Sequence, residues 1–78
     1  MSRKEEYLEK IREMSGLKHA ILSMLRVDRY AMSVEFVLIT DRAYTAQEAE
    51  KARQISLEFV PHPFIAETRI VKRLPDEE

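Results

Sequence analysis

The segment "SVEFVLITDRAYTAQEAE", residues 33 to 50, decides how this chain folds. In its first eight residues Val34, Phe36 and Leu38 alternate onto one face, which is the pattern of a β-strand. Val37 and Ile39 make the opposite face apolar as well. Because apolar residues occupy both faces, we predict a strand that is covered on both sides.

The second half of the segment is best interpreted as a joint between this strand and a helix. Thr45 and Glu48 have the spacing of a capping box, in which a hydroxyl and a carboxylate satisfy the first amides of a helix. The apolar spacing that follows predicts a helix over residues 46–59. Asp41 then forms the turn, and we do not interpret it as a general base.

The same helix signals occur at the N-terminus. Ser2 and Glu5 repeat the capping-box spacing, and an apolar stripe follows them. Gly16 is the only glycine and stands where a left-handed helix terminator is expected. We therefore predict a first helix over residues 3–15.

Two further strands are predicted around these elements. Residues 17–25 fit a helix or a strand, and we favour a strand over 19–28, with continuation of the first helix as the alternative. A hairpin turn is expected near residues 28–31. After the prolines that end the second helix, residues 64–74 indicate a last strand.

The predicted fold class is α+β, a small ferredoxin-like α-β-β-α-β sandwich with two helices and a three-stranded, mainly antiparallel sheet. The hairpin makes strands one and two antiparallel, and a crossover through the second helix makes strand three parallel to strand two. Pairing of strand three with strand one would give the spatial order two, one, three. Residues 1–75 are expected to form one domain, and residues 76–78 an acidic tail.

The amino-acid composition and net charge exclude several kinds of site and of protein. The 78-residue chain has no cysteine, which excludes disulfides and thiolate metal sites and fits a reducing compartment. Its net charge of −1 gives no general attraction to nucleic acid. No apolar run reaches the ~20 residues of a membrane span, and the charged N-terminus is unlike a secretory signal. A domain this small has a limited core, so association with another copy is a natural source of stability.

The sequence predicts no enzyme. Nucleophilic catalysis needs a base beside a hydroxyl or thiol, and the only imidazoles, His19 and His62, stand in no triad pattern. A single glycine cannot make a phosphate-binding loop or the GXXG loop of a KH module.

Two surface features remain as candidate binding sites. An apolar set is expected to share a sheet face that the second helix does not cover, where either the first helix or a partner would cover it: Leu22, Val37, Ile39, Ile65 and Val71. A basic set is expected to gather along strands one and three, as a solvated face or as a phosphate-binding face: Arg26, Arg29, Arg69, Lys72 and Arg73.

A family resemblance rests on Gly16-Leu17, Arg26, Asp41 and "TAQEA" at residues 45–49, in that order and spacing. The stretch resembles the cytoplasmic C-terminal domain of cation diffusion facilitator (cation efflux) transporters. In that family a histidine often follows the alanine of this helix, where Glu50 stands here. A histidine and an acid often stand in the last strand, where this chain has Lys72 and Leu74.

The resemblance implies a non-enzymatic, homodimerising regulatory domain of a divalent metal cation transporter. It implies a cytoplasmic location, with tethering to the membrane through a part outside this sequence. A divalent ion such as zinc would be the metal, for which His19 and His62 are the candidate ligands. The alternative function is a nucleic-acid-binding or accessory module of a larger enzyme that uses the basic set. A small-molecule-binding subunit is a third hypothesis.

Overall fold

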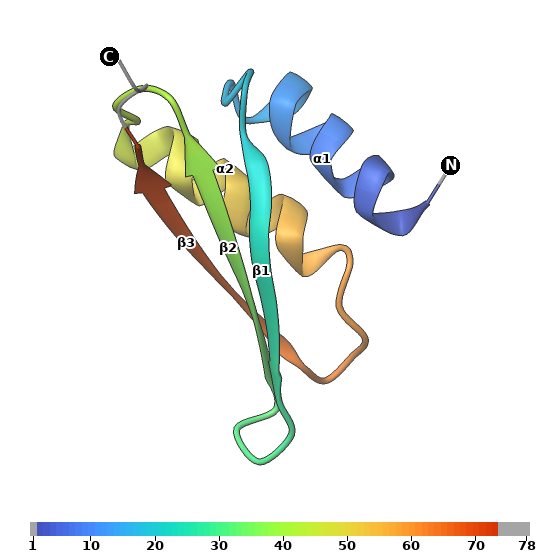
Figure 1. The fold of residues 1–78 in the computed structure, drawn as a ribbon. Coiled ribbons are helices and arrows are strands. Elements are labelled where there is room, and N and C mark those ends of the chain that lie inside the picture. The colour runs from blue at the N-terminus through green and yellow to red at the C-terminus, as the bar shows by residue number, and fades with distance from the viewer. Residues whose placement is uncertain (1, 74–78) are drawn as a thin grey trace.

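The computed structural model describes residues 2–73 and consists of two helices and a three-stranded sheet (Figure 1). The elements are α1 (Arg3–Met14), β1 (Ile21–Asp28), β2 (Ser33–Thr40), α2 (Ala46–Leu57) and β3 (Ile65–Lys72). The predicted order and the α+β class are confirmed, and residues 17–20 do not continue the first helix. The predicted acidic tail and Leu74 lie outside the described residues.

The ends of both helices follow from the residues that the sequence places there. The hydroxyl of Ser2 accepts from the amide of Glu5 at 3.1 Å, and the Glu5 carboxylate accepts from the Ser2 amide at 3.2 Å. Thr45 and Glu48 make the same pair of bonds at 3.1 and 3.0 Å. Gly16 has a φ of 90°, a left-handed conformation that is unstrained only for glycine. Both capping boxes and the glycine terminator are therefore confirmed.

The sheet is mixed, with the spatial order β1-β2-β3. β1 pairs antiparallel with β2, and β3 pairs parallel with β2 from Ser33 opposite Ile65 to Thr40 opposite Lys72. The predicted order two, one, three is therefore wrong. The physical reason is that β2 has apolar residues on both faces, and a central strand buries them better than an edge strand does. β2 is buried along most of its length, whereas β1, at the edge, is exposed along most of its length.

A β-bulge in β1 changes which face its residues occupy. Leu22 pairs with Leu38 and Met24 with Val37, so Ser23 is the extra residue. At the other end of the strand the carboxylate of Asp28 accepts from the amides of Tyr30 and Ala31, at 3.0 and 3.1 Å. This turn lies where the sequence predicted it.

Both helices pack on the same side of the sheet. One core joins residues of α1, α2, the α1–β1 connection and the helix-facing side of the sheet: Tyr7, Leu8, Ile11, Leu17, Ala20, Val34, Phe36, Leu38, Ala52, Ile55 and Ala66. The opposite side of the sheet, called the outer face below, is covered by neither helix. Although β2 was expected to be covered on both sides, it is flanked by strands and covered by helices on one side only.

Candidate binding surfaces

The outer face divides into an apolar half and a charged half. Following the strand pairing, its residues are Ile21, Met24, Arg26 and Asp28 of β1, Ser33, Glu35, Val37 and Ile39 of β2, and Ile65, Glu67, Arg69 and Val71 of β3. Five neighbouring apolar residues form what we call the apolar cluster: Ile21, Met24, Val37, Ile39 and Val71. Ile21 and Met24 are 48% and 45% exposed. Val71 is 37% exposed, whereas Val37 at the centre is 9% exposed, so solvent reaches the cluster mainly along β1 and β3.

One of the five residues predicted for this face needs correction. Leu22 points to the helix side and packs against the core, because the bulge at Ser23 reverses the alternation of β1. Ile21 takes its place beside Ile39. Ile65 does lie on the outer face, but the row of Arg26, Glu35 and Glu67 separates it from the apolar cluster.

The predicted basic face does not form. It required strands one and three to be neighbours, and β2 separates them. Arg26 and Arg69 stand on opposite edge strands of the outer face, while Lys72 is in register with Thr40 on the helix side. Arg29 is in the hairpin turn, and Arg73 follows β3 at the opposite end of the sheet. Glu35 and Glu67 lie in register with Arg26, so the five basic residues do not form one continuous surface.

The two histidines do not share a site. His19 precedes β1 and His62 precedes β3, and the pairing of both strands with β2 places those starts at opposite ends of the sheet. An eight-residue strand is roughly 26 Å long. Within residues 2–73 no three His, Cys, Asp or Glu side chains gather as a metal site would require. The structure therefore does not bring the predicted ligands together.

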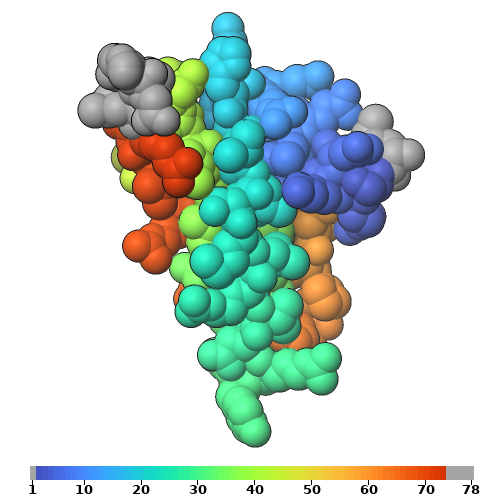
Figure 2. All heavy atoms as spheres, in the orientation of Figure 1, coloured from blue at the N-terminus to red at the C-terminus, as the bar shows by residue number. Residues whose placement is uncertain are grey.

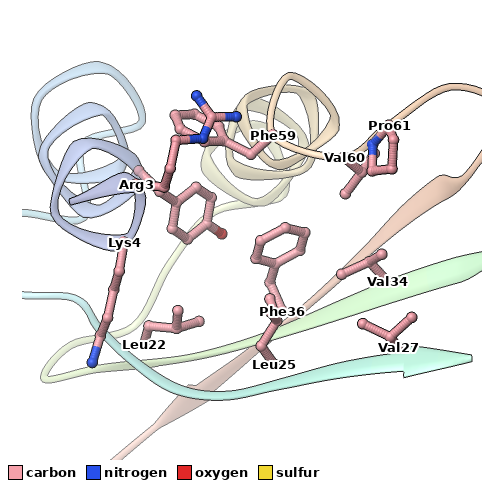
Figure 3. A pocket seen from close by; sticks show the side chains of 11 residues that line it. Arg3, Lys4, Leu22, Leu25, Val27, Val34, Phe36, Phe59, Val60 and Pro61 are labelled. Atoms are coloured by element: carbon pink, nitrogen blue, oxygen red, sulfur yellow. The ribbon is translucent and has the colours of Figure 1, made fainter.

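A groove that the sequence did not predict lies on the helix side of β1. It has a volume of about 300 Å³ and is lined by Arg3, Lys4, Tyr7, Leu22, Leu25, Val27, Val34, Phe36, Phe59, Val60 and Pro61. Figure 3 shows Arg3 and Lys4 at the α1 end and Val27 and Pro61 at the other. We call it the β1 groove.

A buried polar network joins α1, α2 and β3 behind this groove. The Ser56 hydroxyl donates to the carbonyl of Ala52 at 2.9 Å and accepts from the Thr68 hydroxyl at 3.1 Å. Its single proton is therefore used, so the Tyr7 hydroxyl, 2.7 Å away, must be the donor to Ser56. Burial disfavours the phenolate and raises the pKa of Tyr7 to about 12. The arrangement is structural, because Tyr7 and Ser56 are buried in the core and Thr68 is half-buried beside them.

The joint between β2 and α2 is held by Arg42. Its guanidinium donates to both carboxylate oxygens of Glu48, at 3.1 and 2.9 Å, and to the carbonyl of Gly16 after α1. The bond from Arg42, followed by the backbone bond of Thr45, lowers the pKa of Glu48 to about 2. Arg42 and Glu48 thus bind each other and the end of α1, which gives this pair a structural role.

Comparisons with protein-family models, curated proteins and solved structures find no match to this chain. Neither helix within residues 2–73 has the length and hydropathy needed to cross a bilayer.

Proposed function

We propose that this chain is a non-enzymatic domain that joins two copies of itself through the outer face of its sheet. Its role would be that of a regulatory dimerisation module, as in the cytoplasmic domain of a divalent cation efflux transporter, which it resembles in sequence. The observation that carries the proposal is the apolar cluster, which neither helix covers and whose β1 and β3 residues are exposed.

The chemistry of the outer face supports a second copy as its partner. Water in contact with a continuous apolar surface is unfavourable, and soluble monomers seldom keep such surfaces unless they bind something. The other half of the face mixes two arginines with three carboxylates, so it carries little net charge and does not repel an identical face. A twofold arrangement places one apolar cluster against the other and is the commonest symmetry of dimers.

Sedimentation at micromolar concentration tests the proposal with wild type and Ile39→Asp. We expect a wild-type dimer. Because Ile39 is in the apolar cluster, the substitution would bury an unpaired carboxylate, which costs several kcal/mol and raises the dimer Kd by at least about a hundredfold.

Leu57→Asp is the matched control. Leu57 is 45% exposed on α2, which packs on the other side of the sheet, so this variant should sediment like the wild type. Ile21→Asp, at an exposed position of the edge strand, repeats the test if Ile39→Asp does not fold. A wild-type monomer across the range contradicts the proposal, as does a folded Ile39→Asp protein that still dimerises.

The non-enzymatic part of the proposal is supported by the placement of the two histidines, which are the only imidazoles in the sequence. His19 and His62 lie at opposite ends of the sheet, so neither can assist the other. We expect no hydrolytic or transferase turnover by the purified chain. Turnover that disappears when either histidine is replaced would contradict this expectation.

A further inference from the structure

The β1 groove lies beside the outer edge of β1. Within residues 2–73, β1 pairs only with β2, so its other edge has no strand partner. Unpaired backbone N–H and C=O groups on a strand edge can bind a further strand. The bulge at Ser23 leaves Met24–Asp28 as a regular stretch of this edge.

The side chains on this stretch are those of a covered strand, although nothing in residues 2–73 covers them. Leu25 and Val27 face the helix side and are each 52% exposed. Natural edge strands are commonly protected by lysine, proline or charged residues that point inward, and here the inward positions are apolar. Figure 2 shows β1 exposed along its length, with α1 to one side.

The charged residues that line the β1 groove indicate the charge of the segment that would bind there. Among residues 2–73, the charged residues that line it are Arg3 and Lys4, both cations, and Arg3 also lies 3.6 Å from the Glu6 carboxylate. The Arg3 guanidinium lies 4.7 Å from the centre of the Phe59 ring, which holds it over the apolar floor. A carboxylate at the α1 end of the groove would therefore be attracted, whereas a cation would be repelled.

We propose that the β1 groove and the adjacent strand edge bind an extended segment of another protein, with apolar residues at alternate positions and an acidic residue at one end. The segment adds as a fourth strand along Met24–Asp28, and its alternate side chains fill the groove over Leu25 and Val27. Backbone bonds supply affinity in this mode of recognition, and the groove supplies selectivity. The groove is on the opposite side of the sheet from the proposed dimer face.

Selection from a display library of random heptapeptides against the full chain tests the proposal. We expect selected peptides to alternate apolar residues and to carry Asp or Glu at one end. Their binding should slow hydrogen exchange of the amides in Met24–Asp28. Absence of enrichment, or enrichment of peptides without alternation, overturns the proposal.

Two matched variants locate the site. Val27→Lys places a charge in the groove and should weaken a selected peptide at least about tenfold. Ile65→Lys makes the same change at a 54% exposed residue of β3 and should leave binding unchanged. Equal effects of the two variants overturn the assignment to the β1 groove.

Charge reversal tests the acidic preference. Arg3→Glu with Lys4→Glu is compatible with folding, because acidic residues are favourable in the first turn of a helix. Selection against this double variant should replace the acidic end with Lys or Arg, and an unchanged preference contradicts the role given to these cations. Ile39→Asp should bind the selected peptides like the wild type, so the result does not depend on dimerisation.

Discussion

Replacing Tyr7 with phenylalanine should change both the stability of the protein and its dependence on pH. The Tyr7 side chain is 2% exposed, and its ring lies 4.8 Å from that of Phe36 and 5.4 Å from that of Phe59. Phenylalanine keeps these ring contacts and removes only the hydroxyl that donates to Ser56. Because Ser56 retains its bonds to Ala52 and Thr68, we expect a loss of about 1 kcal/mol in the free energy of unfolding at pH 7.

At alkaline pH the sign of this difference should reverse. The pKa of Tyr7 is about 12 in the folded chain, compared with 10.0 for an exposed tyrosine. The unfolded state therefore releases its proton first, so the stabilisation is complete below pH 10 and is lost as the pH rises towards 12. For Tyr7 this loss amounts to about 1.4 kcal/mol at pH 11 and about 2 kcal/mol at pH 12. Tyr7→Phe has no such loss, so the two proteins should be about equally stable near pH 11.

Urea unfolding at pH 7 and at pH 11, at one protein concentration, measures the effect. Tyr30→Phe is the control at pH 7, since Tyr30 is fully exposed and its loss should change stability by only a few tenths of a kcal/mol. A constant difference between wild type and Tyr7→Phe at both pH values would refute the reasoning, because it would mean that burial does not hold this hydroxyl protonated.

Three further substitutions test the fold. Thr45→Ala should lower the free energy of unfolding by about 1 kcal/mol through loss of the cap on α2, and no change in urea unfolding would contradict the cap. Gly16→Ala should lower it by at least about 1 kcal/mol, because φ is 90° and the new Cβ would lie 3.1 Å from a Glu48 oxygen; a melting temperature equal to wild type would refute this. Thr40→Val should leave the melting temperature unchanged or raise it, since the buried Thr40 hydroxyl has no hydrogen-bond partner within residues 2–73, and a drop of several degrees would reveal a partner.

Local signals in the sequence predicted the elements well, whereas relations between distant residues were missed. The capping residues Ser2 and Thr45 and the terminator Gly16 act within one turn of the backbone, so their spacing was sufficient. The strand order was not predictable from spacing, because it depends on which strand gains most from two neighbours. The prediction that Leu22 lies on the outer face was wrong because one unpaired residue, Ser23, shifts the alternation of β1. No residue pattern in the sequence indicates this bulge.

The candidate surfaces likewise divide into those that local patterns predicted and those that depend on residues far apart in the chain. Val37, Ile39 and Val71 were correctly expected on the face without α2, because strand alternation alone decides this. The basic set failed because it assumed that strands one and three are neighbours. The β1 groove and the bond from Tyr7 to Ser56 join residues far apart in the chain, and no local pattern indicates them.

The parallel pairing of β2 with β3 has a consequence for synthesis of the chain. Ser33 meets Ile65 only after the whole of α2 has been made, whereas the β1–β2 hairpin can close as soon as residue 40 is available. During synthesis, the edge of β2 that later pairs with β3 therefore stays unpaired until β3 has been made. This unpaired strand contains the apolar run from Phe36 to Ile39. A chain that stops before Ile65 keeps that edge permanently and should be prone to aggregate, since an unpaired apolar strand is a template for others.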